Sequence, residues 1–228
     1  MFSGIVEEKQ IITRVEVRPK DQQPENQQQV DSTIEAKDVS AVTIQISQPK
    51  SFDDLKLGDS IAVDGVCLTL EKIADSKMQF TLGYETLQVL KITPMQASQK
   101  LLGKVVNLER SLRFGDRIHG HLVTGHVDTM GVVVRSQMLG GSLLLDVQVP
   151  LSYQPWVWVK GSICLHGVSL TVNQIQPSSQ GSGLVISVCL IPETISRTNL
   201  SILKINDLIH VEFDYYAKAI INYEKNKV

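Results

Sequence analysis

GDSIAVDGVCLTL (Gly58–Leu70) decides the fold, because the chain carries a second version of it, KGSICLHGVSLTV (Lys160–Val172). Six equivalent positions hold the same residue at a constant separation of 102 residues, as at Ser60 and Ser162. A long repeat with a fixed offset predicts that one structural unit has been duplicated.

Each copy is predicted to be a β-hairpin. Asp64-Gly65 in the first copy and His166-Gly167 in the second lie between runs of alternating apolar residues, which is typical of a two-residue hairpin loop. Alternation across the strands gives one wholly apolar face, expected in the core: Ile61, Val63, Val66, Leu68 and Leu70. The other face gathers small, mostly polar side chains: Ser60, Ala62, Cys67 and Thr69, and in the second copy Ser162, Cys164, Ser169 and Thr171. One such patch would be an ordinary solvated strand face, but its recurrence favours a binding surface.

Composition indicates a globular protein without nucleic-acid or membrane partners. The 228 residues allow two domains of about 100 residues each. The net charge is −2, with no basic stripe and no apolar run of about 20 residues. The start, MFSGIVEEK, does not resemble a signal peptide. Three cysteines, Cys67, Cys164 and Cys189, suit a reducing compartment, so a cytoplasmic location is expected.

Short strands dominate both predicted units. The expected strands are Phe2–Val17, Ala41–Ser47, Met78–Leu82 and Val105–Arg110 in the first unit, and Leu143–Val149, Trp156–Val159, Leu184–Leu190 and Leu208–Phe213 in the second. Asp21–Asp31 is polar and predicted to be a surface loop, Glu85–Lys100 a helix interrupted at Pro94, and Asp214–Lys225 a short amphipathic helix. This pattern is typical of a small barrel or sandwich in each half.

A second echo links the start of the chain to its middle. Gly4 and Val6 in SGIVEE match Gly125 and Val127 in TGHVDT, and the second unit is predicted to begin near Gly115.

Three kinds of side chain are candidates for chemistry. His119, His121 and His126 could hold a metal, but without a carboxylate–histidine motif or a cysteine pair, substrate hydrogen bonding or proton transfer is favoured. Cys67 is either a small buried residue or a nucleophile. Lys160 is either a solvated strand end or an anchor for an anion or carbonyl. Because no phosphate-cradling glycine loop or dinucleotide fingerprint is present, a nucleotide-dependent enzyme is disfavoured.

Seven motifs in order resemble the riboflavin synthase family, alpha-chain type, over essentially the whole chain: MFSGIVEE, GDSIAVDGVCLTL, VNLER, HGHLVTGHVD, KGSICLHGVSLTV, IPETISRTNL and VEFD. The resemblance implies an all-β fold of two tandem six-stranded Greek-key barrels, at 1–114 and 115–213, with a C-terminal helix at 214–228 for oligomerisation. It implies a homotrimer with the active site between subunits, no cofactor and no metal. It leaves association with lumazine synthase open.

The family reaction is the dismutation of two molecules of 6,7-dimethyl-8-ribityllumazine. A four-carbon unit passes between them, giving riboflavin and 5-amino-6-ribitylamino-2,4-pyrimidinedione. Two similar half-sites fit this chemistry, because they would hold donor and acceptor together.

The resemblance assigns catalytic roles to Ser60, Cys67, His121, Lys160 and Asp214. Ser60, Cys67 or water would add to one lumazine. His121, placed with Phe2 and Ser3 near the N-half of the site, would transfer a proton. Asp214 and Lys160 would polarise or orient the second ring. Substrate contacts are expected in an N-half at Phe2, Ser3, Gly4, Ile5, Val6, Leu68, Thr69, Thr81, Leu82, Gly83, Tyr84, Glu85 and Thr86. A C-half is expected to use Gly125, His126, Val127, Ser169, Leu170, Thr171, Leu190, Ile191, Pro192, Glu193, Thr194 and Ile195.

Some positions depart from the family pattern. Asp64 stands where asparagine is common and His166 where aspartate is usual, and the wall after Gly83 is altered and longer. A non-catalytic lumazine- or flavin-binding carrier, or fluorescent protein, is therefore the main alternative. A purely structural duplicated barrel is the third interpretation, and it leaves the paired patches unexplained.

Overall fold

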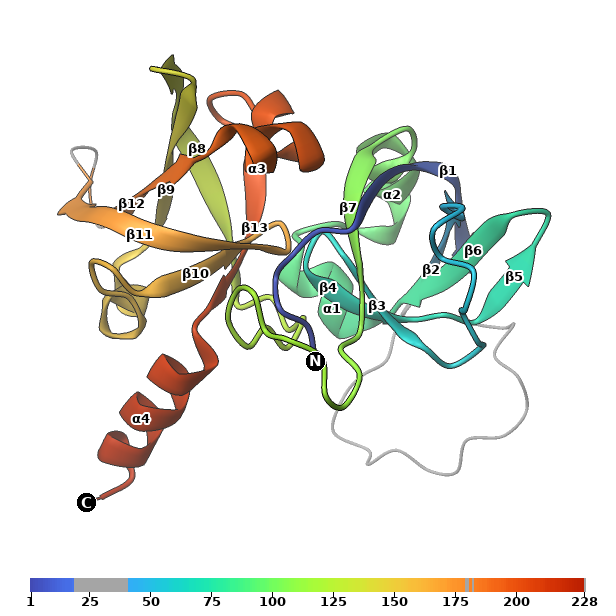
Figure 1. Ribbon diagram of the computed structural model, residues 1–228, viewed down its shortest axis with the longest axis horizontal. Coiled ribbons are helices and arrows are strands. Elements are labelled where there is room, and N and C mark those ends of the chain that lie inside the picture. The colour runs from blue at the N-terminus through green and yellow to red at the C-terminus, as the bar shows by residue number, and fades with distance from the viewer. Residues whose placement is uncertain (19–40, 179–180, 182, 228) are drawn as a thin grey trace.

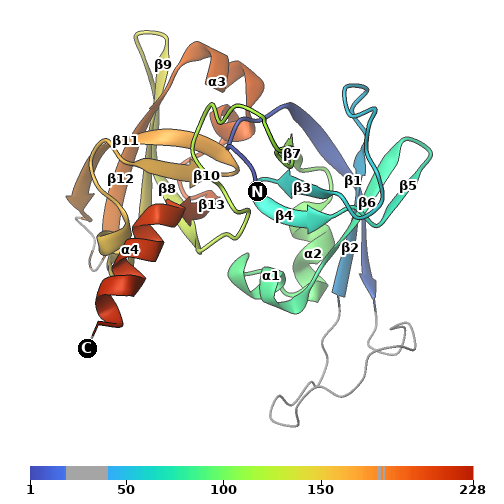
Figure 2. The same ribbon diagram turned by 60° about the horizontal axis from the view of Figure 1, so that its bottom comes forward.

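Two β-barrels lie side by side in a computed structural model, with the N-terminus between them and a helix projecting from the second barrel (Figures 1 and 2). The structure describes residues 1–18, 41–178, 181 and 183–227. The predicted loop at Asp21–Asp31 lies outside these residues. Within the described ranges, none of the helices combines the length and apolarity required to cross a membrane.

The first barrel contains β1 (Glu8–Arg18), β2 (Ala41–Ser47), β3 (Ser60–Val63), β4 (Val66–Thr69), β5 (Lys72–Ala74), β6 (Lys77–Leu82) and β7 (Val105–Arg110). Helices α1 (Tyr84–Val89) and α2 (Pro94–Leu101) lie between β6 and β7. The strand order is β4-β3-β7-β1-β2-β6-β5.

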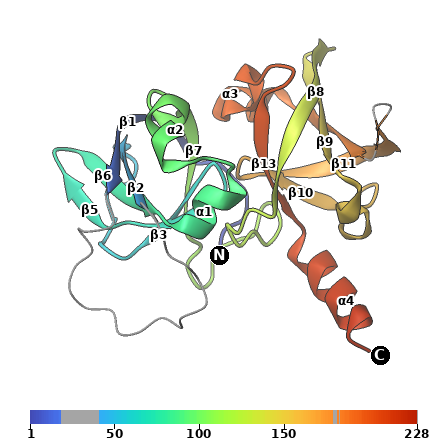
Figure 3. The ribbon, with the colours of Figure 1, turned by 180° about the vertical axis from the view of Figure 1, so that it is seen from behind.

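The second barrel contains β8 (Thr129–Leu139), β9 (Ser142–Pro150), β10 (Ser162–Leu165), β11 (Val168–Pro177), β12 (Gly183–Leu190) and β13 (Leu208–Phe213). A 3-10 turn η2 (Leu151–Trp156) follows β9, and α3 (Pro192–Arg197) and η3 (Asn199–Ile202) precede β13. Helix α4 (Tyr215–Lys225) ends the described chain and leaves the second barrel, as Figure 3 shows from behind.

The strands of the two barrels follow equivalent orders. The second closes in the order β10-β11-β12-β9-β8-β13, and β9 beside β12 makes it a Greek key. In the first barrel β4 and β5 together take the place of the single strand β11, so the sheet has seven strands rather than the predicted six. The all-β class is confirmed, with short helices added at the same corner of each barrel.

Three element predictions need correction. The first strand begins at Glu8 and not at Phe2, which instead forms an isolated bridge with Val123. The predicted strand Trp156–Val159 is absent, because Trp156 ends η2 and packs edge-on against Phe213 with ring centroids 5.8 Å apart. The predicted elements also omit helix α3, which the structure adds after β12.

Both predicted hairpins are confirmed with their register. Ser60 pairs with Thr69, and Ser162 with Thr171. Asp64 and Gly65 have φ of 46° and 79°, and the second loop repeats these values, as a type I′ turn requires. The apolar face is buried inside each barrel, as at Ile61.

The segments before β1 and β8 exchange barrels. We call residues 2–6 the N-terminal strap and residues 122–127 the linker strap. Val6 packs in the core of the second barrel, whereas Val127 packs against the core of the first. Phe2 and Val123 lie between the hairpins in a third apolar cluster with Cys164. Each strap therefore runs across the neighbouring barrel before entering its own.

The hairpin loops meet at the centre of the molecule. A Cβ added to Gly65 would lie 2.6 Å from the backbone nitrogen of Gly167, and one added to Gly167 would lie 2.7 Å from that of Gly65. Only residues without side chains allow this approach, and both also have positive φ. The loops therefore fix the distance between the barrels.

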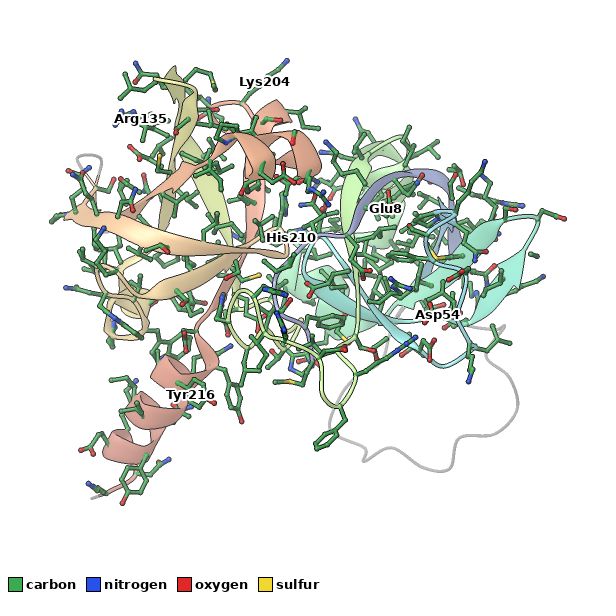
Figure 4. All side chains as sticks on the ribbon, viewed as in Figure 1. Glu8, Asp54, Arg135, Lys204, His210 and Tyr216 are labelled. Atoms are coloured by element: carbon green, nitrogen blue, oxygen red, sulfur yellow. The ribbon has the colours of Figure 1, made fainter. Side chains whose placement is uncertain are left out.

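A buried polar network surrounds this contact. The backbone N–H of Asn107 donates to Oδ1 of Asp64 at 2.8 Å, and that of His210 donates to Nδ1 of His166 at 3.2 Å. Across the interface, Nδ2 of Asn107 donates to the carbonyl of His166, and Nδ1 of His210 lies 2.8 Å from the carbonyl of Asp64. His210 thus lies between the barrels, as Figure 4 shows. Burial raises the pKa of Asp64 to about 7 and lowers that of His210 to about 4.

Gly65→Ala is expected to destabilise the protein more than Gly103→Ala. Both glycines have positive φ, so each alanine costs about 1–2 kcal/mol of backbone strain. At Gly103 a Cβ meets nothing within 4 Å, whereas at Gly65 it meets the opposite loop, which adds about 1–3 kcal/mol of overpacking. Urea denaturation of both variants measures the difference, and equal losses would show that the loop contact is not tight.

Candidate active site

The two hairpins present equivalent polar patches on the outer walls of the barrels. Ser169 in the second barrel occupies the position that Cys67 occupies in the first, and the backbone N–H of each donates to a strap carbonyl. The acceptor for Ser169 is the carbonyl of Gly4, and the acceptor for Cys67 is that of Gly125, both at 2.8 Å. Each patch is thus covered on one side by the strap that crosses it.

The patch on the second barrel contains a serine–histidine pair. Nδ1 of His121 lies 2.7 Å from Oγ of Ser169, within hydrogen-bond distance. The backbone N–H of His121 donates to the carbonyl of Ser3 at 3.1 Å, which fixes the histidine against the N-terminal strap. Burial lowers the pKa of His121, so the imidazole is neutral at neutral pH. A neutral imidazole beside a hydroxyl can accept and return a proton.

The other ring nitrogen of this histidine is available. Nε2 of His121 is buried and has no hydrogen-bond partner among the described residues. Because a buried polar atom without a partner is costly, it marks a place where a ligand or water would bond.

Asp214, the N-cap residue of α4, affects the pKa of His121 in this pair. Its Oδ1 accepts from the backbone N–H of Tyr216 at 2.8 Å and so caps the helix. Its negative charge raises the pKa of His121 against the larger, lowering effect of burial. The sequence-predicted residues Ser169, His121 and Asp214 are therefore brought to one place.

Gly120 allows the close packing at this place. A Cβ there would lie 2.1 Å from the carbonyl of Ser3 and 2.7 Å from Cβ of Ser169. The residue before His121 must therefore be glycine if the strap, the histidine and the serine are to meet.

The patch on the first barrel has different chemistry. Cys67 is half-buried, and a Cβ added to Gly125 would lie 2.6 Å from the Cβ of Cys67. Ser60 lies on the same hairpin face, where its carbonyl accepts from the backbone N–H of Ser111. Cys164, the remaining cysteine of the hairpins, is buried, and burial raises its pKa well above the ordinary value, which suits packing and not nucleophilic attack.

The segment that follows β6 in the first barrel corresponds to the segment that follows β12 in the second. Gly83 and Ile191 are the N-caps of α1 and α3. Thr81 donates from Oγ1 to Glu71 at 2.8 Å, and the space beside Gly83 is open. The residues of the predicted contact set in these two segments have exposed or half-buried side chains: Tyr84, Glu85 and Thr86, and Ile191, Pro192, Glu193, Thr194 and Ile195.

Several predicted contact residues point into the barrels. Leu68 and Leu82 lie in the first core, and Leu170 and Leu190 in the second. They can reach a ligand on the outer wall only through their backbones. Thr69 and Thr171 are exposed on the outer face, as are Lys160 and His126.

The predicted grouping of the half-sites is wrong in one respect. The resemblance groups residues 4–6 and His121 with Cys67, and residues 125–127 with Ser169. The hydrogen bonds instead join Gly4 and His121 to Ser169, and Gly125 to Cys67. The cause is the crossing of the straps, which a repeat in the sequence does not reveal. We therefore define the C-half as the second-barrel patch with the N-terminal strap and His121, and the N-half as the first-barrel patch with the linker strap.

Both half-sites reach the surface on the outer walls of the barrels, where Thr69 and Thr171 are exposed. A cleft of about 960 Å³ lies beside Ser60 and is walled by charged residues that include Arg110 and Arg113. A second cavity of about 660 Å³ lies where Asp64 and His166 meet. Neither cleft is lined by Cys67 or Ser169. The histidines at 119, 121 and 126 do not converge, and the described part of the chain holds no group of three metal-ligating side chains.

Sequence reasoning missed Glu109 and Glu212. Both are nearly buried, at 5% and 2% exposure, and both bond to the straps. A signal was available, because each glutamate lies next to the last residue of the closing strand of its unit and directly follows an apolar residue, Leu108 or Val211.

Comparison with known families agrees with this geometry. The family described as "Lumazine binding domain" matches residues 3–111 and 124–214, one match for each barrel. Among solved structures, LumP complexed with 6,7-dimethyl-8-(1'-D-ribityl) lumazine superposes with a TM-score of 0.69, at 19% identity, over 93% of this chain and 99% of that chain. This likeness shows the fold alone.

Curated relatives carry a more specific name. Riboflavin synthase of Buchnera aphidicola subsp. Schizaphis graminum is 33% identical over 77% of this chain and 79% of its own length. Riboflavin synthase of Bacillus subtilis is 32% identical over 98% of this chain and 89% of its own. The chain therefore belongs to the riboflavin synthase family, built from two lumazine-binding domains.

Asp214→Asn is expected to lower the pKa of His121 further. Asparagine keeps the helix cap, so the substitution removes only the charge that opposes the effect of burial. An NMR titration of the histidine ring protons measures the change. An unchanged pKa of His121 would show that the Asp214 charge does not reach it.

Proposed function

We propose that the protein catalyses the riboflavin synthase reaction on two molecules of 6,7-dimethyl-8-ribityllumazine. One molecule gives up a four-carbon unit and becomes 5-amino-6-ribitylamino-2,4-pyrimidinedione, and the other becomes riboflavin. Family membership at 32–33% identity over most of the chain supports this assignment.

The observation that carries the proposal is the pair of equivalent but chemically unequal half-sites. A dismutation uses two copies of one substrate, so both half-sites should accept the same ring system. It also gives the copies different fates, which requires different chemistry beside each. The C-half has Ser169 with His121, and the N-half has Cys67 and Ser60.

The expected steps use these groups as follows. A nucleophile, for which Ser60, Cys67 and water are candidates, adds at C7 of one lumazine. A base removes a proton from the 7-methyl group of the other, which conjugation with the ring makes acidic. Neutral His121 is the favoured base, because its Nε2 has no hydrogen-bond partner in the described ranges of the chain. Asp214 and Lys160 orient the ring at the C-half.

The alternative is a carrier that binds lumazine or a flavin without turnover. The retained pair of Ser169 and His121 favours the enzyme, because binding alone does not need a neutral base with a free nitrogen.

Turnover of the lumazine alone tests the proposal. Purified protein with 6,7-dimethyl-8-ribityllumazine and a chelator should give one riboflavin for every two lumazines consumed, followed by absorbance. His121→Ala and Ser169→Ala should each lower kcat by about 10²–10⁴-fold, the range for a lost proton-transfer group.

Ser142→Ala is the matched control, because it removes the same hydroxyl at the start of β9, outside both half-sites. Tight binding without turnover would identify a carrier, and no binding would overturn both assignments.

The assembly is part of the same proposal. The outer faces of the half-sites are exposed at Thr69 and Thr171, so two rings are expected to stack where an N-half from one subunit faces a C-half from another. Helix α4 offers a contact surface, since Tyr216, Ile220 and Tyr223 are 60%, 61% and 64% exposed on one side of it. The first turn of α4 is held to the second barrel by an ion pair between Lys218 and Asp128, with 2.9 Å between Nζ and Oδ2. We expect three copies to associate through this helix, and the labelled Tyr216 projects from the barrels in Figure 4.

Ile220→Asp should dissociate the trimer and reduce turnover at least tenfold, because a carboxylate buried in a helix contact is strongly unfavourable. Asn222→Asp is the matched control, since it adds the same charge on the other side of α4. Analytical ultracentrifugation of both variants gives the number of chains. A monomeric Ile220→Asp protein with full activity would show that the site lies within one chain.

The domain limits 1–114, 115–213 and 214–228 and the cytoplasmic location also belong to the proposal. Fractionation of cells that express the tagged protein tests the location. Co-purification with lumazine synthase tests the association that the resemblance leaves open.

A further inference from the structure

Two buried glutamates hold the straps. Both oxygens of Glu109 on β7 are used: Oε1 accepts from the backbone N–H of Ser3 at 2.7 Å and from its hydroxyl at 3.0 Å, and Oε2 accepts from the N–H of Gly4 at 3.0 Å. Glu109 therefore belongs to the first barrel but fixes the strap that lies on the second.

Glu212 on β13 repeats this arrangement in the opposite direction. Its Oε1 accepts from the backbone N–H of Thr124 at 2.7 Å and from its hydroxyl at 2.6 Å, and its Oε2 accepts from the N–H of Gly125 at 3.0 Å. Glu212 belongs to the second barrel and fixes the strap that lies on the first.

The strap residues held in this way are the ones that touch the half-sites. The carbonyl of Gly4 bonds to Ser169 and that of Ser3 bonds to His121, whereas the carbonyl of Gly125 bonds to Cys67. Two successive hydrogen bonds thus connect each glutamate to the half-site on the opposite barrel. The first joins its carboxylate to the strap, and the second joins the strap to the patch. Within the described part of the chain, neither glutamate forms a hydrogen bond with Cys67, Ser169 or His121.

We propose that Glu109 and Glu212 are crossed positioning residues: Glu109 sets the geometry of the C-half, and Glu212 sets that of the N-half. This inference rests on the proposed function for the identity of the half-sites, and it names the residues that shape them. It predicts that a substitution of the glutamate in the last strand of one barrel alters the geometry of the half-site on the other barrel.

A carboxylate suits this role because both oxygens are acceptors. Each strap presents only donors, two backbone N–H groups and one hydroxyl, and hydrogen bonds to a charged acceptor are about twice as strong as neutral ones. Glutamine would replace one acceptor with an NH₂ donor facing an N–H donor, so it keeps the side-chain volume and breaks part of the clamp. Burial raises the pKa of both carboxyls, that of Glu109 to about 7, while the hydrogen bonds from the straps lower it by stabilising the charged form. The clamp by Glu109 is therefore strongest above neutral pH.

Two measurements without any ligand test the crossing. Alkylation of Cys67 by iodoacetamide, followed by peptide mass spectrometry, reports on the N-half. NMR titration of His121 reports on the C-half. Glu212→Gln should raise the Cys67 alkylation rate about tenfold and leave the His121 pKa unchanged. Glu109→Gln should leave the Cys67 rate within about twofold and move the His121 pKa toward its ordinary value, because the loosened strap admits water.

The two variants are controls for each other, since both lose the same group from the same place in a barrel. Equal changes at Cys67 and His121 in both variants would show general loosening and overturn the proposal, as would no change in either. Where Glu→Gln prevents folding, Thr124→Ala and Ser3→Ala each remove one donor from a strap, and they should give the same crossed pattern with smaller changes.

Riboflavin titration then connects the inference to the ligand. Glu109→Gln should weaken binding at the C-half by about tenfold, and Glu212→Gln should do the same at the N-half, where ligand protection of Cys67 identifies the site. A protein that does not bind riboflavin at all would count against the proposed function, while the crossed pattern in the ligand-free measurements would stand.

Discussion

The close approach of the two hairpin loops is the constraint on which the rest of the structure depends. Gly65 and Gly167 lie against each other without room for a Cβ on either. This contact places the outer faces of both hairpins beside the straps, and it brings Asp64 and His166 into one buried network with Asn107 and His210. The half-sites lie on the same hairpins, so their separation within one chain is set at this point.

The network also explains how the departures at Asp64 and His166 are accommodated. In the first barrel the loop aspartate accepts the N–H of Asn107, and in the second the loop histidine accepts the N–H of His210 through Nδ1. Both residue types supply an acceptor at the same place. Burial keeps His166 neutral by lowering its pKa well below the ordinary value, so the substitution adds no buried positive charge to the interface at neutral pH.

The duplication gives symmetry to the scaffold and not to the chemistry. Glutamates, glycines and hairpin loops recur at equivalent positions, because both barrels need the same clamp and the same turn. The pair of Ser169 and His121 is matched in the other half by Cys67 beside Gly125. A symmetric frame with unequal side chains suits a reaction in which two identical molecules have different fates.

The repeated stretch by itself determined the hairpins, their register, the apolar face and the duplicated all-β architecture. These follow from alternation and turn chemistry, which act between residues close in the chain. The motifs also named Ser169, His121 and Asp214 before any geometry was known. Only the tertiary structure decided that Gly4 lies on Ser169 and Gly125 on Cys67, that Trp156 ends a 3-10 turn, and that Glu109 and Glu212 hold the straps. Those contacts join residues about 60 to 165 positions apart or depend on aromatic packing, and local sequence patterns carry no information about which barrel a crossing segment will cover.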